Sequence, residues 1–292
     1  MEKLELKALG KINLGLDVLG RRENGYHDVR MVMQTVYLYD NVILVEKPHN
    51  KIEIDTNLPY LPRDENNIAW KAAALLMEEF QITRGIKIIL DKHIPVAAGM
   101  AGGSANAAAV LYGMNRMFRL GLSKEELMER GVKLGADVPY CIMRGTVLAE
   151  GIGEKLTALA PLPRCQILIA KPSVSVSTKT VYEKLDKEPI KEHPDIDGII
   201  KGLEAQDIGK VASSMGNVLE KVTAGEYPVI TKIKECMLRH GALGAMMSGS
   251  GPTVFGIFED RRKAREAYRS IKIQRLARQA YIAGAHNVRR KW

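Results

Sequence analysis

The 292-residue sequence contains little of what marks a disulfide-linked, zinc-binding or membrane-spanning protein. Its three cysteines, Cys141, Cys165 and Cys236, are widely separated and lack CxxC or CxxH spacing, so we expect reduced thiols in the core and no structural metal. No apolar run approaches the ~20 residues that span a membrane, and residues 1–5 lack the apolar core of a signal peptide. We therefore expect a cytoplasmic protein with no membrane partner and no dedicated metal site.

The charge is uneven along the chain. The formal net charge of +9 comes from 43 basic and 34 acidic residues. Eleven of the basic residues but only one acidic residue, Glu266, lie in residues 261–292, which leaves 32 basic and 33 acidic residues in the rest. Nucleic-acid binding needs several clustered basic side chains, so this near-neutral body predicts no nucleic-acid partner. The basic tail is typical of a solvated helix, although it could also bind an anionic surface.

Hydrophobic periodicity indicates an α+β chain. Residues 4–20 and 29–58 have strand character, whereas residues 67–80 place apolar side chains at helical spacing. Ser123 and Glu126 predict a capping box for a helix that ends near Gly135. Further strands are expected at residues 146–149 and 166–170, and a hairpin-like region at residues 246–258. Prolines interrupt regular secondary structure, so Pro161-Leu162-Pro163 predicts a domain boundary near residue 160. The first domain would be residues 1–160 and the second residues 161–292.

A glycine-rich run joins a predicted strand, residues 86–90, to an alanine-rich predicted helix that starts near residue 105. Gly99, Gly102 and Gly103 lack Cβ atoms, so backbone N–H groups can approach an anion closely, and the first turn of the helix adds unpaired N–H groups. The run therefore predicts a phosphate-binding loop. Its spacing is neither that of the common P-loop nor that of the dinucleotide fingerprint. A tight turn before a buried helix remains the alternative.

Two further segments make this interpretation more specific. Residues 7–20 alternate like a strand and are followed by Asn24-Gly25-Tyr26-His27, and residues 244–256 form another glycine-rich turn. In this order the three segments resemble the signature motifs of the GHMP kinases. The details resemble those members of the non-mevalonate isoprenoid pathway that phosphorylate the 2-hydroxyl group of 4-diphosphocytidyl-2-C-methyl-D-erythritol. Four features carry that resemblance: Lys11-Ile12-Asn13-Leu14, Asn24-Gly25-Tyr26-His27, the Gly135-to-Tyr140 turn, and Ser177-Thr178 shortly before Tyr182. It extends from about residue 3 to about residue 260.

The resemblance implies a two-domain fold. The first half would resemble the second domain of ribosomal protein S5, the second half would be ferredoxin-like, and the active site would lie in the cleft between them. ATP and Mg²⁺ are implied, with a small-molecule substrate, and we expect a monomer or weak homodimer. Mg²⁺ binds largely through substrate phosphates and keeps several waters, so the lack of an acidic cluster is compatible with it.

By this resemblance, Asp137 occupies the position of the catalytic base and Lys11 that of the charge-stabilising lysine. Pro139 is expected to force the preceding residue out of the helical region and so to fix the Asp137 carboxylate. Lys11 and Asn13 share one side of their strand, and Asn13 would position the substrate. The alternatives are a helix-capping Asp137 and a solvent-exposed Lys11 at a sheet edge.

The remaining site residues are assigned in the same way. Tyr26 and His27 match the pair that recognises the cytosine, with His27 reading its edge, and Tyr182, where the family often has phenylalanine, would stack on the opposite side. Thr178 would also contact the substrate. The nucleotide would contact Asn66, Asn67, Ile68, Lys92, Pro95, Gly99, Met100, Ala101, Gly102, Gly103 and Ser104.

The loop departs from the family pattern in having alanine at four positions. Ala97, Ala98 and Ala101 replace glycines, and Ala105 replaces a second serine. We expect negative φ angles at most loop positions, which alanine tolerates. A position that needs a positive φ would put the nucleotide cradle in doubt.

Two rival functions remain open on the sequence. A different GHMP kinase, acting on mevalonate, homoserine or a sugar, would leave Tyr26, His27 and Tyr182 without a base to stack. A non-enzymatic RNA-associated protein is suggested by the basic tail and the S5-like half. Its RNA affinity would fall steeply with salt, and it would show no ATP turnover.

Overall fold

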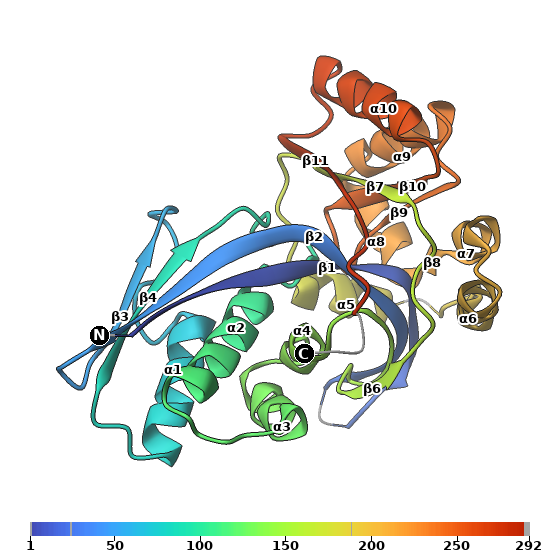
Figure 1. Ribbon diagram of the computed structural model, residues 1–292. Coiled ribbons are helices and arrows are strands. Elements are labelled where there is room, and N and C mark those ends of the chain that lie inside the picture. The colour runs from blue at the N-terminus through green and yellow to red at the C-terminus, as the bar shows by residue number, and fades with distance from the viewer. Residues whose placement is uncertain (1, 24, 188, 289–292) are drawn as a thin grey trace. The chain divides into compact units, whose positions relative to one another are not determined.

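Two long strands, β1 (Lys3–Arg21) and β2 (His27–Lys47), run through both of the units into which the chain divides (Figure 1). The computed structural model describes residues 2–23, 25–187 and 189–288, so the motif residue Asn24 lies outside the described part. Unit 1 consists of Met1–Gly10, Leu38–Val96 and Ala101–Met143, and unit 2 of Lys11–Tyr37, Ala97–Met100 and Arg144–Trp292. The boundary near residue 160 stays a prediction.

Unit 1 packs helices against its part of a seven-stranded sheet. β2 pairs antiparallel with β4 (Gly85–Asp91), and β3 (Ile52–Thr56) pairs parallel with β4. The helices are α1 (Ile68–Glu79), α2 (Gly102–Met117), α3 (Lys124–Leu134) and α4 (Val138–Met143). Gly113 lets α2 approach the sheet, because a Cβ atom there would lie 2.4 Å from a Leu44 methyl group.

The helix predictions for this unit are confirmed. Asn67 caps α1 by accepting a hydrogen bond from the Ala69 N–H group. Ser123 and Glu126 form the expected capping box at the start of α3, which ends just before Gly135. Residues 29–58 contain both β2 and β3, separated by a short irregular stretch after Lys47.

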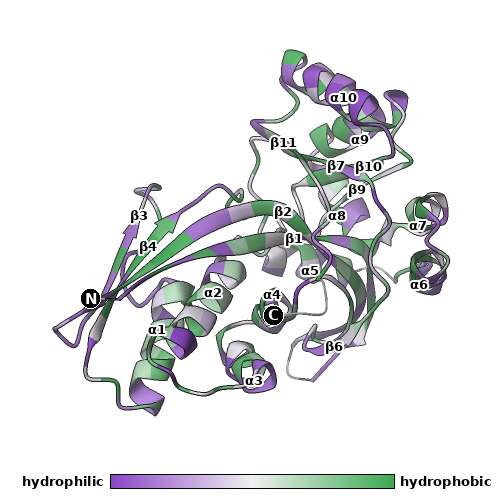
Figure 2. Ribbon diagram, viewed as in Figure 1, coloured by the Kyte–Doolittle hydropathy of each residue, from purple (hydrophilic) through white to green (hydrophobic). Residues whose placement is uncertain are grey.

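Unit 2 contains a four-stranded antiparallel sheet in the order β11-β7-β10-β9. Its strands are β7 (Gln166–Lys171), β9 (Gly244–Met247), β10 (Val254–Phe258) and β11 (Gln279–Ala283), so the predicted hairpin is confirmed. The helices α9 (Val229–Arg239) and α10 (Arg261–Ile273) pack on it. α10 buries three small or apolar side chains and, apart from the exposed Ile273 at its end, is otherwise hydrophilic (Figure 2), as expected of a solvated basic helix. The strand β11 in the basic tail was not predicted.

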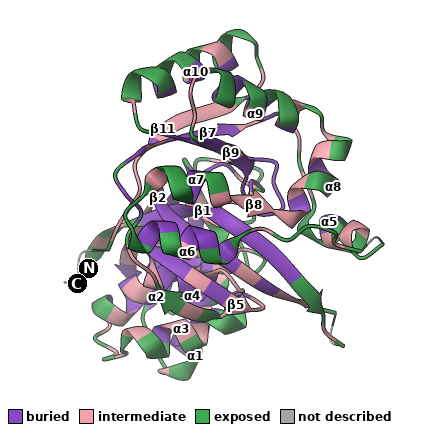
Figure 3. Ribbon diagram, turned by 90° about the vertical axis from the view of Figure 1, so that its right-hand side faces the viewer, coloured by how far each residue is buried: buried purple, intermediate pink, exposed green. Residues whose placement is uncertain are grey.

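The rest of unit 2 surrounds its parts of β1 and β2, which are largely buried (Figure 3). β5 (Thr146–Gly151) pairs with β2 and with β6 (Lys155–Ala158), and the short β8 (Gly216–Asn217) pairs parallel with β1. Four helices complete the unit: α5 (Thr178–Leu185), α6 (Ile196–Glu204), α7 (Ile208–Ser214) and α8 (Val218–Glu226). Among the helices that the structure describes, none is long and apolar enough to cross a membrane.

Candidate active site

Lys11 and Asn13 lie side by side on β1 in unit 2. The Lys11 ammonium donates a hydrogen bond to the Asn13 Oδ1 atom at 2.7 Å, and both residues are buried. Because alternate residues of a strand share a face, Ile12 and Leu14 point the other way and are fully buried. The prediction that Lys11 and Asn13 share a face is therefore confirmed, and the alternative of a solvent-exposed Lys11 is wrong.

Two glycine-rich segments that are far apart in the sequence meet beside these residues. The Ser248 hydroxyl accepts a hydrogen bond from the Asn13 backbone N–H at 3.3 Å and donates one to the Gly99 carbonyl at 3.0 Å. Gly99 has a φ of +68°, and a Cβ atom there would lie 2.1 Å from the Ser248 carbonyl oxygen, so only glycine fits. The Met100 carbonyl accepts from the Lys11 N–H at 3.1 Å. Residues 97–100 of the predicted phosphate loop thus pack between the first and third motifs.

The loop ends at the N-terminus of α2, where no side chain caps the helix. Ala101 is the N-cap residue and forms no side-chain hydrogen bond, and Gly102, Gly103 and Ser104 form the first turn. Unpaired N–H groups of a first helical turn, joined to the partial positive charge of the helix end, favour a bound phosphate. The start of α2 therefore offers the donors that a phosphate group needs.

The expectation of negative φ angles is wrong at two of the loop alanines. Ala97 has a φ of +49° and Ala101 a φ of +54°, whereas Ala98 is not in the left-handed region. This conformation brings Cβ close to the following carbonyl oxygen, and it is adopted here because the surrounding contacts define the path of the loop. The chain therefore keeps the glycine-like path and accepts strain at two alanines.

A buried carboxylate in unit 1 holds the chain at both ends of the loop. Asp40, which is fully buried on β2, accepts hydrogen bonds from the His93 and Ile94 N–H groups at 2.7 and 2.8 Å. Its other oxygen pairs with the Lys92 ammonium and accepts from the Asn106 amide at 2.9 Å. Lys92 also donates to the Asn106 Oδ1 atom at 2.8 Å, which closes the triangle. Lys92 thus anchors the chain before Pro95, and Asn106 anchors the second turn of α2.

Ile68, another predicted nucleotide contact, lies at the start of α1 next to the glycines of unit 1. Its methyl groups lie 3.5 and 3.6 Å from the positions that Cβ atoms would take on Gly103 and Gly135. Asn67 uses its side chain to cap α1 and to donate to the Pro62 carbonyl at 2.8 Å. Asn66 donates to the carboxylate of Asp64 at 3.1 Å. The structure therefore brings Ile68 to the loop and gives both asparagines local partners.

Asp137 lies in unit 1 immediately before α4, and its carbonyl accepts from the Cys141 N–H at 3.0 Å. The expectation that Pro139 forces the preceding residue out of the helical region is wrong, because Val138 is the first residue of α4. Pro139 occupies the first turn, where the missing N–H group would have no helical partner, so proline is tolerated there. The start of a short helix, rather than an extended dipeptide, therefore presents the Asp137 carboxylate.

Two of the predicted base-recognition residues, His27 and Tyr182, pack against each other in unit 2. The His27 and Tyr182 rings have centroids 4.6 Å apart and planes inclined at 33°. The His27 Nε2 atom lies 2.7 Å from the Asp186 carboxylate, which is also 3.4 Å from an Arg21 nitrogen. Tyr26 is 58% exposed. The direct partner of Tyr182 is therefore His27, which the sequence analysis had placed at the edge of the base.

Thr178 connects the start of α5 to the third motif. Its hydroxyl lies 2.8 Å from the Ser250 hydroxyl. The Ser250 carbonyl accepts from the Thr223 hydroxyl of α8 at 3.3 Å. This chain of contacts fixes the helix that carries Tyr182 relative to the glycine-rich turn.

The cysteines and the acidic side chains add no further chemistry. All three cysteines are buried thiols outside any disulfide, as expected, and burial raises the pKa of the Cys165 thiol to about 12. A thiol held protonated in this way is a poor nucleophile. Within residues 2–23, 25–187 and 189–288, no group of three or more His, Cys, Asp or Glu side chains could hold a metal ion.

Comparison with known proteins assigns this arrangement to a family. The model of the GHMP kinases N terminal domain matches residues 67–145, and the GHMP kinases C terminal model matches residues 199–275. A protein of Lachnospira eligens described as 4-diphosphocytidyl-2-C-methyl-D-erythritol kinase is 59% identical over 96% of this chain and 98% of its own length. The chain belongs to this family of GHMP kinases.

Further relatives of this GHMP kinase agree. A protein of Lachnoclostridium phytofermentans with the same description is 52% identical over 97% of each chain. A crystal structure of 4-(cytidine 5'-diphospho)-2C-methyl-D-erythritol kinase matches with a TM-score of 0.81 and 30% identity, covering 98% of this chain and 100% of that one. Homoserine kinase from Cytophaga hutchinsonii, at 22% identity and a TM-score of 0.77, shares the fold. The predicted α+β class and two-domain GHMP kinase architecture are confirmed, and the protein is a kinase.

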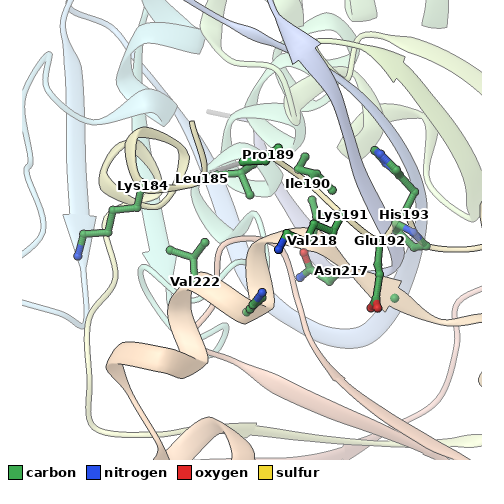
Figure 4. Close-up of a pocket in the computed structure, with 13 residues that line it drawn as sticks. Lys184, Leu185, Pro189, Ile190, Lys191, Glu192, His193, Asn217, Val218 and Val222 are labelled. Atoms are coloured by element: carbon green, nitrogen blue, oxygen red, sulfur yellow. The ribbon is translucent and has the colours of Figure 1, made fainter. Parts of the chain in front are cut away.

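One cavity of the kinase was not predicted. It has a volume of about 690 Å³ and lies in unit 2 between the segment after α5 and the start of α8 (Figure 4). Its charged or titratable lining residues are Lys184, Lys191, Glu192, His193 and Lys221, and most of the others are apolar. Asn217, also in its wall, donates to the carbonyls of Met247 and Gly249 at 2.9 and 2.8 Å and so holds the third motif.

Sequence reasoning also missed Asp40 and Asp186. Each is an isolated acidic residue whose partners lie many positions away, 52 for the Asp40–Lys92 pair and 159 for the His27–Asp186 pair. For Asp40, the one available sequence signal was an aspartate within a largely apolar predicted strand. For Asp186, no sequence signal pointed to a functional role.

Proposed function

We propose that this kinase transfers the γ-phosphoryl group of ATP to the 2-hydroxyl group of 4-diphosphocytidyl-2-C-methyl-D-erythritol. The observation that carries the proposal is the convergence of Lys11, Asn13, Gly99 and Ser248 in one hydrogen-bonded cluster of a chain 59% identical to a kinase described by that substrate. As a member of the GHMP kinases, the protein uses ATP and acts on a small molecule.

On the nucleotide side, the loop from Pro95 to Ser104 would hold the phosphates. Gly99, Met100 and Ala101 would face them with backbone groups, and Gly102, Gly103 and Ser104 would supply the uncapped N–H groups of α2. Asn66, Asn67 and Ile68 would lie on the adenine side. Lys92 would support the loop, because its Nζ atom lies 3.3 Å from the position that a Cβ atom would take on Gly102. Mg²⁺, bound mainly through phosphates and water, would neutralise part of their charge.

The residues of the chain would then act on the hydroxyl group. Asn13 would orient the substrate and holds the Lys11 ammonium, whose charge would offset the negative charge that builds up on the transferred group. Asp137 would accept the hydroxyl proton while the new O–P bond forms and the bond between the γ-phosphorus and the bridging oxygen of ADP breaks. The transition state is loose, so positioning and charge neutralisation, rather than a strong base, would supply most of the acceleration.

On the substrate side, Tyr26, His27 and Tyr182 would bind the cytosine. A flat pyrimidine that stacks on an aromatic ring gains on the order of 1–3 kcal/mol per contact. Thr178, held by Ser250, would contact the substrate at the start of α5.

The test is ADP release by the purified kinase with Mg·ATP and one of four alcohols: the cytidyl compound, mevalonate, homoserine or galactose. We expect turnover with the cytidyl compound alone and a fall of about 10²–10⁴-fold in kcat for Asp137→Ala. The matched control is Asp55→Ala, which removes a half-exposed carboxylate on β3 of the same unit and should leave kcat unchanged.

Turnover with another of the alcohols would keep the family and overturn this substrate. Absence of any turnover, with salt-sensitive RNA binding that is lost when residues 261–292 are removed, would favour an RNA-associated protein instead.

A further inference from the structure

Asp186 fixes one edge of the His27 ring. The His27 Nε2 atom and the Asp186 Oδ1 atom are 2.7 Å apart, and the His27 side chain is only 9% exposed. The other Asp186 oxygen lies 3.4 Å from an Arg21 nitrogen, which holds the carboxylate in place from the far side. His27 begins β2 and Asp186 directly follows α5, so two separate elements determine this contact.

The contact determines which ring nitrogen carries the proton. An ionised carboxylate only accepts hydrogen bonds, so the Nε2 atom must donate. In the neutral ring the Nδ1 atom is then left as a bare acceptor, because the hydrogen bond at one nitrogen sets the state of the other. His27 Nδ1 forms no hydrogen bond with any residue that the structure describes, so it is available to a ligand.

The surroundings of the ring suit a flat ligand with an amino group. The Tyr182 ring lies against one side of His27 with centroids 4.6 Å apart, and the neighbouring Tyr26 is 58% exposed. An aromatic ring that approaches this cluster meets a hydrogen-bond acceptor at Nδ1. Cytosine presents an exocyclic amino donor on its pairing edge, whereas uracil presents a carbonyl acceptor at the same position.

We propose that Asp186 makes the site selective for cytosine over uracil by holding His27 in the tautomer whose Nδ1 atom accepts a hydrogen bond from the cytosine amino group. Asp186 is thus a positioning residue that acts through His27. The inference rests on the proposed function, since it concerns the cytidyl group of that substrate. With uracil, the His27 Nδ1 atom and the uracil carbonyl oxygen would face each other as two acceptors with no hydrogen between them. The lost hydrogen bond corresponds to roughly a tenfold or greater loss of affinity.

The first measurement is calorimetric binding of CDP and UDP to the full-length kinase and to its Asp186→Asn variant. The asparagine amide can donate to Nε2, so His27 can take the other tautomer and present an N–H group at Nδ1. We expect wild-type protein to prefer CDP, and Asp186→Asn to reduce the ratio of CDP to UDP affinity by about tenfold or more. Asp186→Glu, which keeps an acceptor, should restore most of the preference.

The matched control is Asp91→Asn. Asp91 accepts from the His93 Nε2 atom at 2.9 Å, the same pair of atom types, on an exposed surface of unit 1. This variant should leave the ratio of CDP to UDP affinity unchanged.

The second measurement reads the tautomer directly, by two-bond ¹H–¹⁵N correlation of the histidine side chains in mildly alkaline buffer. The chain has six histidines, and the signal that disappears in His27→Gln identifies the relevant ring. We expect the Nε2–H tautomer in the wild type and a shift toward the Nδ1–H tautomer in Asp186→Asn. A purely structural contact would change neither this signal nor the ratio of the two affinities.

The outcomes separate this inference from the proposed function. CDP binding with a cytosine preference that persists in Asp186→Asn overturns the inference alone, as does an Nδ1–H tautomer in the wild type. Binding of neither CDP nor UDP to the wild type overturns the cytidyl substrate, and the inference with it.

Discussion

The two buried lysines beside the phosphate loop have different partners. Lys92 pairs with the carboxylate of Asp40 inside unit 1, so its charge is matched within its own cluster. Lys11, in unit 2, donates to the Asn13 Oδ1 atom at 2.7 Å, so the Asn13 amide orients the ammonium. A buried charge needs compensation, and the Asp40 carboxylate supplies it for Lys92 in a cluster that also includes Asn106 of α2. The Lys92 cluster therefore supports the chain around the loop, whereas Lys11 is the lysine to which the proposed function gives a role in phosphoryl transfer.

The largest effect is expected on stability, when the Asp40–Lys92 pair is broken. Asp40→Asn leaves the Lys92 ammonium buried without its carboxylate and should lower the free energy of unfolding by about 3–5 kcal/mol. Urea denaturation followed by circular dichroism measures this change. Asp55→Asn is the control, because the half-exposed Asp55 carboxylate makes only long ion pairs, 3.9 Å to Arg63 and 3.7 Å to Lys87. The asparagine oxygen can still accept from the Thr56 N–H group, so the variant should change stability by less than about 0.5 kcal/mol. Equal effects of the two variants would contradict the assignment of Lys92 and Asp40 as a support.

On the chemical side, Lys11→Met should reduce kcat by about 10²–10³-fold with much less change in stability than Asp40→Asn. Steady-state ADP release measures kcat, and thermal unfolding measures stability. Lys7→Met is the matched control on the same strand, because Lys7 is exposed and lies over the Tyr39 ring at 4.4 Å. If Lys11→Met lowers stability but leaves kcat unchanged, Lys11 has a structural role instead of a catalytic one.

The glycines on the two sides of the loop sharpen the contrast. Gly99→Ala should destabilise the protein by about 2–4 kcal/mol, because the alanine would need a positive φ and would collide with the Ser248 backbone. Gly102→Ala should change stability by less than about 1 kcal/mol. Its Cβ atom would lie 3.1 Å from an Ile94 methyl group and 3.3 Å from the Lys92 ammonium, both on side chains, and alanine favours a helical position. The midpoint of guanidinium unfolding measures the stability of both variants. Similar midpoints would show that the backbone around Ser248 can move to accommodate a Cβ atom at residue 99.

The smallest effect concerns the strained alanine between these glycines. Ala101→Gly should raise the free energy of unfolding by about 0.5–1 kcal/mol, because relief of the left-handed strain exceeds the entropy that glycine loses on folding. Ala98→Gly is the control at a position without positive φ, and it should destabilise the protein. Differential scanning calorimetry compares the stability of the two variants. If Ala98→Gly also stabilised the protein, the gain could not be assigned to the positive φ of Ala101.

Local signals predicted the local features of this molecule. The Ser123 capping box, the helix capped by Asn67 and the shared face of Lys11 and Asn13 depend on residues two to four positions apart, and the structure confirms them. The two positive-φ alanines could not be predicted from alanine itself, because contacts such as Gly99 with Ser248, 149 residues apart, define the path of the loop. The helical Val138 shows the same limit, since the rule for residues before proline is a preference that packing overrides.

The interleaved course of the chain has a consequence for its synthesis. The chain crosses between the two units five times, and four of the loop residues, Ala97–Met100, form one of the excursions. Unit 1 therefore lacks part of its sequence until Met143 has been translated. Unit 2 begins at Lys11 but includes β11 and the bridge between Val36 and Ala285, so it stays incomplete until the last segment leaves the ribosome. A nascent chain released after residue 260 would lack the strand that pairs with β7 and would expose that edge to other chains.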